Sequence, residues 1–138
     1  MAVNARIQHA AFHSTDVNKA RKFYGEVLGL REIVRPTLGS RGVWFSMGPD
    51  QEIHISISSE SAVPGAGRNL NPRKRGNEGR HLAFAVDDLD EVKGRLKANG
   101  FSWVGSNDNL PQIFTEDLDG NLVEINSGWM KQKEKEKY

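Results

Sequence analysis

His9-Ala10-Ala11-Phe12 returns 72 positions later as His81-Leu82-Ala83-Phe84. Each copy is followed by an aspartate that can cap a helix, a stretch of helical spacing and a glycine that can end it: Asp16 and Gly29, then Asp88 and Gly100. This order indicates an internal repeat, in which the two leading histidines occupy equivalent positions. A repeat-related pair of this kind is suited to one shared site.

The repeat predicts the same order of elements, βαβββ, in each half of the chain. In the first half we expect strands over 6–12, 31–34, 42–47 and 52–57, with a helix over 16–28. In the second half we expect strands over 81–86, 101–104, 112–115 and 121–126, with a helix over 88–98. The prediction is one α+β domain over 1–138, made of module 1 at 5–58, a linker at 59–78, module 2 at 79–127 and a charged tail at 128–138.

Composition narrows the function classes. The chain has 138 residues, a net charge of +1 and no cysteine, which excludes disulfides, thiolate nucleophiles and cysteine-bound metals. The sequence has neither a basic-then-apolar leader pattern nor an apolar run near the roughly 20 residues that span a bilayer. We therefore expect a soluble cytoplasmic protein with no membrane or nucleic-acid partner.

Strand alternation assigns the histidines to the sheet face opposite the large apolar side chains. Ile53 and Ile55 would pack on the helix, while Glu52, His54 and Ser56 line the other face; Glu124 lies between Val123 and Ile125 in the same way. The candidate site residues are His9, His54, His81 and Glu124. A lone strand histidine is usually hydrogen-bonded or exposed, but three imidazoles and a carboxylate at repeat-related positions predict a divalent-metal site.

The sequence resembles the vicinal oxygen chelate superfamily, which includes glyoxalase I, bleomycin-resistance proteins and extradiol dioxygenases. The resemblance rests on Ile7-Gln8-His9, Phe23-Tyr24-Gly25-Glu26-Val27-Leu28-Gly29-Leu30, Gly79-Arg80-His81-Leu82-Ala83-Phe84 and Glu116-Asp117-Leu118-Asp119-Gly120-Asn121-Leu122-Val123-Glu124-Ile125. It implies a glyoxalase-like fold, in which two βαβββ modules form a curved mixed sheet around a central cleft, and a homodimer. It carries metal ligands onto His9, His81 and Glu124, with His54 at the position of a fourth ligand.

The resemblance implies a metal-dependent lyase or isomerase similar to lactoylglutathione lyase. Its substrate would be a small molecule with vicinal oxygens, such as a glutathione or other thiol adduct, and its metal Zn, Ni, Co or Fe. An Fe(II) ring-cleaving dioxygenase and a non-catalytic drug- or metabolite-binding dimer are the alternatives. Glu124 is the expected catalytic residue. His54 stands where relatives carry Glu or Gln, which leaves open whether it is a ligand or a base.

Substrate contacts are less marked in the sequence. Trp44 and Phe114 fall on the histidine face and would form an apolar wall there, unless they only pack at the rim. Arg73, Lys74 and Arg75 in the linker would clamp a carboxylate, unless they are simply solvated. Glu52 shares the face of His54 and is either a second candidate base or a surface residue.

Overall fold

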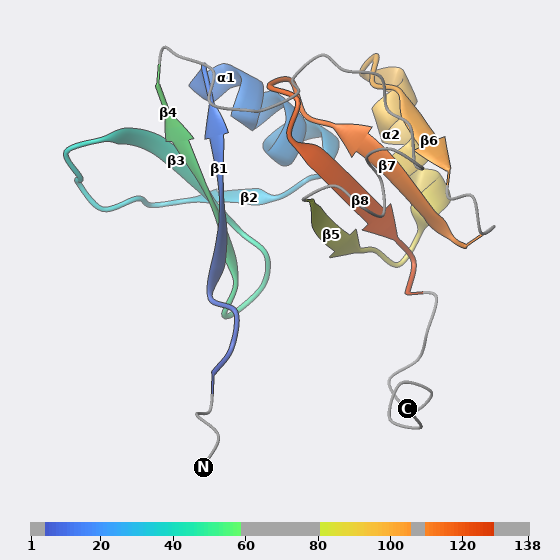
Figure 1. Ribbon diagram of the computed structural model, residues 1–138, viewed down its shortest axis with the longest axis horizontal. Coiled ribbons are helices and arrows are strands. Elements are labelled where there is room, and N and C mark those ends of the chain that lie inside the picture. The colour runs from blue at the N-terminus through green and yellow to red at the C-terminus, as the bar shows by residue number, and fades with distance from the viewer. Residues whose placement is uncertain (1–4, 59–80, 106–109, 129–138) are drawn as a thin grey trace. The chain divides into compact units, whose positions relative to one another are not determined.

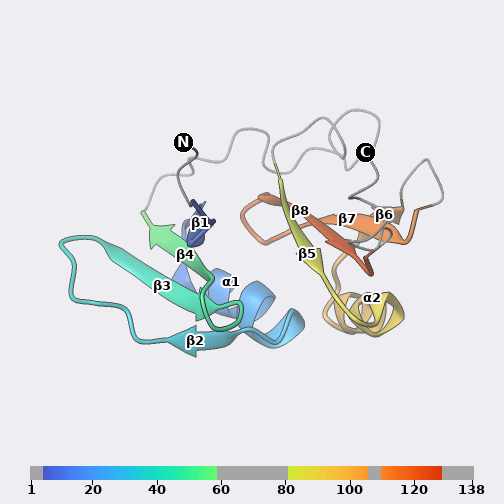
Figure 2. The ribbon, with the colours of Figure 1, turned by 90° about the horizontal axis from the view of Figure 1, so that it is seen from below.

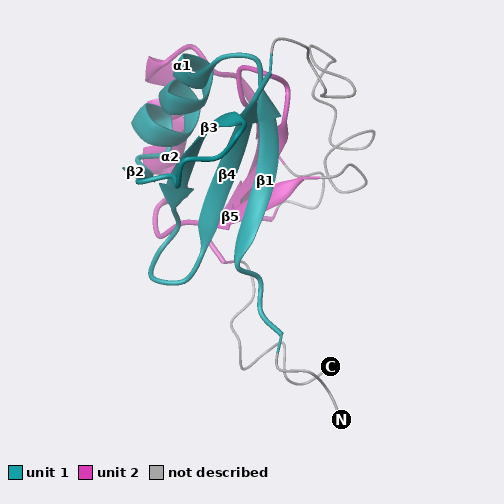
Figure 3. Cartoon of the chain, turned by 90° about the vertical axis from the view of Figure 1, so that its left-hand side faces the viewer, with its two compact units in different colours: residues 1–64 teal, residues 65–138 magenta. Residues whose placement is uncertain are grey.

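The computed structural model describes residues 5–58, 81–105 and 110–128. The chain divides into two compact units, residues 1–64 and residues 65–138, which Figure 3 shows in different colours. The predicted linker at 59–78, with Arg73, Lys74 and Arg75, lies outside the described residues, as do residues 129–138 of the predicted tail. No helix in the described part of the chain is long and apolar enough to cross a membrane.

Unit 1 follows the predicted βαβββ order (Figure 1). Its elements are β1 (His9–Ser14), α1 (Val17–Ala20), η1 (Arg21–Val27), β2 (Arg31–Ile33), β3 (Arg41–Ser46) and β4 (Glu52–Ile57). The strand order in its sheet is β1-β4-β3-β2. β1 is parallel to β4, and the other two pairs are antiparallel. The chain between β1 and its parallel partner β4 runs through the helical segment, β2 and β3, which gives the long connection that a parallel pair requires.

Unit 2 repeats this topology. Its elements are β5 (Leu82–Ala85), α2 (Leu89–Ala98), β6 (Trp103–Gly105), β7 (Gln112–Glu116) and β8 (Leu122–Asn126). The sheet order is β5-β8-β7-β6. As in unit 1, the first and last strands along the chain, β5 and β8, are parallel, and the other two pairs are antiparallel. The predicted α+β fold of two βαβββ modules is therefore confirmed.

The helical segment of each unit covers one face of that unit's sheet, as Figure 2 shows from below. In unit 1 the buried side chains on this side are Phe23, Tyr24, Val27, Val43, Phe45, Ile53 and Ile55. In unit 2 they are Phe84, Leu89, Leu96, Ile113, Val123 and Ile125. The residues that alternate with them, among them His54 in unit 1 and Glu124 in unit 2, lie on the opposite sheet face.

Both predicted helix caps are present. The Oδ1 atom of Asp16 accepts a hydrogen bond from the backbone N–H of Asn18 at 2.8 Å. Asp88 Oδ1 accepts two, from the backbone of Asp90 at 2.9 Å and of Glu91 at 3.0 Å. Gly29 and Gly100 follow the helices with φ of 73° and 78°, the left-handed conformation that ends a helix at low cost for glycine.

The helix of unit 1 is not α-helical throughout, in contrast to the prediction of one regular helix. Beyond Ala20 it widens into the π-helical segment η1, and the backbone N–H of Leu28 donates to the carbonyl of Phe23 at 3.0 Å. Phe23, Tyr24 and Val27 are all at most 1 % exposed. The wider turn accommodates an extra residue per turn and lets this crowded apolar set face the sheet.

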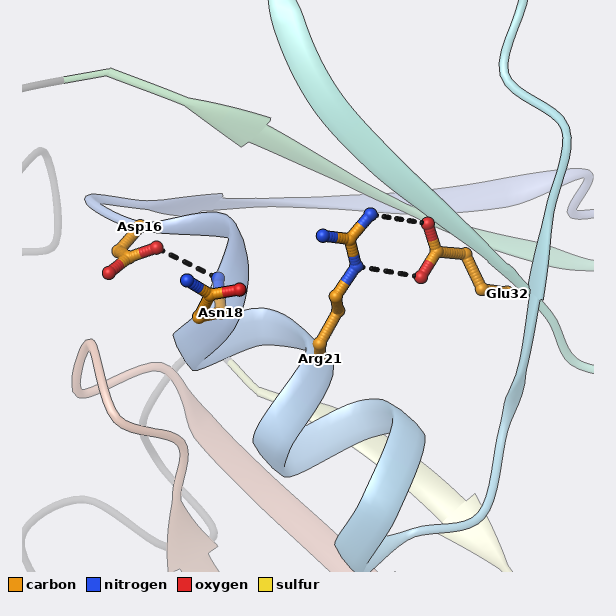
Figure 4. A network of polar contacts seen from close by, with 4 residues as sticks. All are labelled: Asp16, Asn18, Arg21 and Glu32. Atoms are coloured by element: carbon orange, nitrogen blue, oxygen red, sulfur yellow. Dashed lines mark hydrogen bonds and ion pairs between the residues drawn. The ribbon is translucent and has the colours of Figure 1, made fainter.

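A bidentate ion pair joins this helical segment to β2. The Arg21 guanidinium donates through Nε to Glu32 Oε2 at 2.9 Å and through Nη2 to Oε1 at 2.8 Å (Figure 4). The hydrogen bond from Arg21, together with its positive charge, lowers the pKa of Glu32 below its usual value. Both side chains are nearly half exposed, so water and salt screen the pair.

Gly42 permits the close approach of β3 to β4. A Cβ atom at this position would stand 2.6 Å from the carbonyl oxygen of Ile55 and 3.1 Å from Arg35 Nε. The first of these contacts involves backbone of the β3–β4 ladder, which cannot shift without breaking ladder hydrogen bonds. Close backbone approach, rather than a left-handed φ, is therefore the reason for glycine here.

We expect the Arg21–Glu32 pair to make stability depend on pH. Its contribution is complete above the ordinary glutamate pKa of 4.5 and is lost as the pH falls through the lowered pKa of Glu32. Urea unfolding from about pH 7 to about pH 3 should show wild type losing up to about 1 kcal/mol more than Glu32→Gln. Glu26→Gln, which removes an exposed pair with Lys22, is the control. Equal losses in wild type and Glu32→Gln would contradict the prediction.

We expect Gly42→Ala to destabilise the protein by about 1–3 kcal/mol, because its methyl group would overlap the carbonyl of Ile55. Gly39→Ala is the matched control, since a Cβ at that position meets no atom within 4 Å, and it should stay within about 0.5 kcal/mol of wild type. Denaturant midpoints of the three proteins give the comparison. A Gly42→Ala variant as stable as Gly39→Ala would show that the strands separate easily there.

Candidate functional site

Strand register places one equivalent row of side chains on each sheet. In unit 1 the paired residues Ala11, His54, Trp44 and Ile33 cross β1, β4, β3 and β2. In unit 2 the row is Ala83, Glu124, Phe114 and Val104, across β5, β8, β7 and β6. Paired residues project to the same face of a sheet. The predicted equivalence of His54 and Glu124 is therefore confirmed by the register.

Three aromatic rings are stacked face to face on the side of the unit 1 sheet that carries His54. The His54 imidazole lies against the Trp44 indole with centroids 3.7 Å apart and planes 1° from parallel. His9 stacks on the other side of His54, at 4.1 Å and 13°. His54 is thus held between two rings. The predicted apolar-wall residue Trp44 contacts a predicted site residue directly.

Glu52 completes the surroundings of His54. Its Oε2 atom lies 2.7 Å from His54 Nε2, and the two side chains are only 29 % and 16 % exposed. The two residues are one pleat apart on the same strand face, as alternation predicted. The interpretation of Glu52 as a solvated surface residue is therefore wrong, because its carboxylate is paired and largely covered.

His9 and His13, the other two histidines of unit 1, also make side-chain contacts. His9 is exposed, and its Nδ1 is within hydrogen-bond distance of the Gln8 amide oxygen. An amide oxygen only accepts hydrogen bonds, so this contact favours the His9 tautomer that is protonated on Nδ1. His13 is half-buried, shares this face further along β1 and contacts the Ser58 hydroxyl through Nε2.

Unit 2 brings its two predicted site residues together. His81 Nε2 lies 2.9 Å from Glu124 Oε2, and the side chains are 19 % and 12 % exposed. The other carboxylate oxygen, Oε1, accepts a hydrogen bond from the Asn126 amide at 3.0 Å. Phe114 meets the His81 ring edge-on, with centroids 5.6 Å apart and planes at 85°. Glu124 is thus oriented by partners at both oxygens.

A tight turn before β8 sets the register of Glu124. Asp117 is 8 % exposed, and its Oδ1 accepts hydrogen bonds from the backbone N–H groups of Asp119 and Asn121, both at 2.9 Å. Its Oδ2 accepts one from the Asn121 side chain at 2.6 Å. These bonds fix the β7–β8 connection, and register there decides which face Glu124 occupies.

The donor types in both units suit a divalent cation. Neighbouring ligand atoms at 2.0–2.2 Å from one metal stand about 3 Å apart, which is the spacing of His81 Nε2 and Glu124 Oε2. The in-plane lone pairs of the stacked His9 and His54 rings lie in nearly parallel planes, because the ring centroids are 4.1 Å apart and the planes differ by 13°. A shared cation would therefore require the exposed His9 ring to turn. Among the described residues, no group of three or more potential ligands is gathered in one place. The four-ligand set, which draws two residues from each unit, stays a prediction.

Two orienting residues were missed by the sequence reasoning. Gln8 precedes β1, and only its contact with the neighbouring His9 ring reveals its role. Asn126 lies two residues after Glu124 on the same strand face, and its amide donates a hydrogen bond to the Glu124 carboxylate. An amide two residues from a carboxylate on the same strand face is the signal that could have found it.

Comparisons with known proteins agree with the fold described above. The sequence model of the Glyoxalase/Bleomycin resistance protein/Dioxygenase superfamily matches residues 6–125. A glyoxalase family protein from Bacillus anthracis is 30 % identical, with a TM-score of 0.68 over 91 % of this chain and 96 % of that one. A search of curated proteins found no match.

Two further solved structures are similar. A lactoylglutathione lyase from Agrobacterium tumefaciens is 25 % identical, with a TM-score of 0.62 over 94 % of this chain and 97 % of that one. TnmS3, an antibiotic binding protein from Streptomyces sp. CB03234, is 24 % identical, with a TM-score of 0.66 over 91 % and 97 %. The second likeness concerns the fold alone.

We expect Asp117→Ala to destabilise the protein by about 1–3 kcal/mol, because it leaves buried backbone donors without a partner. Leu118→Ala, at the 47 % exposed tip of the same turn, should change stability by less than about 0.5 kcal/mol. Thermal or urea unfolding separates the two. If Asp117→Ala unfolded together with Leu118→Ala, the turn would not depend on the carboxylate.

Proposed function

Since this chain belongs to the Glyoxalase/Bleomycin resistance protein/Dioxygenase superfamily, we propose that it is a metal-dependent enzyme of the vicinal oxygen chelate type. The leading reaction is that of a lyase or isomerase similar to lactoylglutathione lyase. The substrate is a small molecule with two vicinal oxygens, such as the adduct of an aldehyde with glutathione or another thiol. The proposal includes a homodimer in the cytoplasm and a Zn, Ni, Co or Fe ion.

The contact between His81 and Glu124 is the observation that supports this proposal best. An imidazole nitrogen and a carboxylate oxygen 2.9 Å apart, both largely shielded from water, have the types and spacing of adjacent metal ligands. Asn126 holds the second oxygen of Glu124, as partners of metal-binding carboxylates commonly do. His9 and His54 are the proposed ligands from unit 1, with His54 alternatively acting as a base.

The chain's own residues would bind, orient and deprotonate the substrate. The metal, when bound, supplies positive charge that stabilises the negative charge developing on the two substrate oxygens. Proton transfer is assigned to Glu124 or to His54, the two groups at equivalent positions of the repeat. Trp44 and Phe114, next to them in register, would exclude water from the reacting carbon.

Two other functions use the same residues differently. An Fe(II) dioxygenase would need two imidazoles and one carboxylate, which His9, His81 and Glu124 could supply. A non-catalytic binding protein would have no use for a metal at these residues. Metal content separates the binding protein from the enzymes, and the identity of the metal separates oxygen chemistry from acid–base chemistry.

We expect purified, tag-free protein to bind one divalent metal per site, and His81→Ala and Glu124→Ala to weaken binding at least about tenfold. Calorimetric titration with Zn, Ni and Co gives the affinities. His13→Ala is the matched control, because it removes an imidazole from the same face of β1 that is outside the proposed set. If wild type neither holds nor is stabilised by any of these metals, the chelate proposal is wrong.

The metal-loaded protein is then assayed with the hemithioacetal of methylglyoxal and glutathione. Turnover that disappears in Glu124→Ala supports the lyase reaction. Failure with every one of Zn, Ni and Co would reject that reaction while leaving metal binding intact. Oxygen consumption with Fe(II) and a catechol would then favour the dioxygenase instead.

A further inference from the structure

His54 is confined on both faces of its ring. Its cross-strand partner Trp44 covers one face at a centroid distance of 3.7 Å, and His9 covers the other at 4.1 Å. Rings at these centroid distances are in van der Waals contact with both faces of the imidazole, which leaves no room for it to tilt while both neighbours stay in place. The plane of the His54 imidazole is therefore set by its neighbours.

With the ring plane set, His54 can still differ in which of its two ring nitrogens carries the proton. Glu52 Oε2 lies 2.7 Å from Nε2, and an ionised carboxylate only accepts hydrogen bonds. Nε2 must therefore be the protonated nitrogen, which leaves the lone pair of a neutral ring on Nδ1. With side-chain exposures of 16 % and 29 %, this bond is partly shielded from water and correspondingly stronger.

The fold itself does not require a carboxylate at position 52. In unit 2 the equivalent position of β8 is occupied by Leu122, which is 4 % exposed. Ser46, which faces Glu52 across the β3–β4 ladder, directs its hydroxyl to the carbonyl of Gly48 instead. Within the described part of the chain, His54 is the polar side chain that Glu52 contacts. The presence of a glutamate here is thus explained by the imidazole and not by the sheet.

We propose that Glu52 is a positioning residue for His54. By accepting a hydrogen bond from Nε2–H it fixes the tautomer, and with Trp44 it fixes the ring plane, so that Nδ1 is the nitrogen offered to a metal or a substrate proton. A histidine ligand oriented in this way by a carboxylate typically binds metal about 10–100-fold more tightly than without it. The consequence for metal binding rests on the proposed function, but the orientation of His54 does not.

The test is side-chain NMR of ¹⁵N-labelled protein above about pH 8, where an ordinary imidazole is neutral. The chain has four histidines, so the His54 signals are assigned by their absence in His54→Ala. In wild type we expect a one-bond signal from Nε2–H of His54, protected from exchange with water. Glu52→Ala should lose it, because the proton then exchanges freely. Glu52→Gln should retain it, since an amide oxygen also accepts a hydrogen bond.

Glu26→Ala is the matched control, because it removes an exposed glutamate of unit 1 that pairs with Lys22. A His54 signal that is unchanged in Glu52→Ala, or a wild-type ring protonated on Nδ1, would overturn the proposal. Zinc titration of the same proteins separates the two proposals. If wild type binds no zinc but its Nε2–H signal depends on Glu52, the proposed function fails and the positioning role stands. If zinc binds and neither signal nor affinity responds to Glu52→Ala, the positioning role fails alone.

Discussion

The parallel pairing of the first and last strands in each unit is the constraint on which the candidate site depends. β1 pairs with β4 so that Ala11 faces His54, and β5 pairs with β8 so that Ala83 faces Glu124. Both parallel neighbours are alanines, whose small side chains leave space beside the functional group. A shift of one residue in strand register would point the side chain of His54 or Glu124 toward the apolar layer between the sheet and the helix. The buried isoleucines on either side of His54 make that slip costly.

The two units share this frame but use it for different chemistry. Unit 2 has a carboxylate at the row position of Glu124 and an imidazole, His81, beside it. Unit 1 has the imidazole of His54 at that position and a carboxylate, Glu52, two residues earlier on the same strand. The repeat therefore preserves a position without preserving the residue type. Equivalence in the fold is a guide to where chemistry occurs and not to which group performs it.

Most of the fold could be predicted from local patterns. The order of elements, the Asp16 and Asp88 caps and the inward isoleucines all follow from spacing within a few residues, which short-range physics controls. The π-helical segment η1 could not, because the packing of Phe23, Tyr24 and Val27 on the sheet decides how the helix is wound. The equivalence of His54 and Glu124 was predictable because it is a matter of register.

The contacts of the candidate site were harder to predict, because they depend on side-chain conformation. Alternation gave the shared face of Glu52 and His54, but not that their atoms meet at 2.7 Å. The stack of His54 between Trp44 and His9 required the pairing of three strands, which the sequence does not state. The contact of His81 with Glu124 likewise joins residues 43 positions apart.

Both units nevertheless end with an imidazole–carboxylate contact of similar length, 2.7 Å and 2.9 Å, built from non-equivalent positions. A carboxylate that is largely covered by protein requires a hydrogen-bond donor or a cation, and an imidazole N–H can serve as a donor on each face. In the His54–Glu52 pair, the His54 ring is confined by stacking. In the His81–Glu124 pair, the Glu124 carboxylate is held by its hydrogen bond from Asn126. In unit 1 the imidazole is therefore the group held in a fixed orientation, and in unit 2 it is the carboxylate. This difference assigns the oriented nitrogen lone pair to His54 and the oriented oxygen to Glu124.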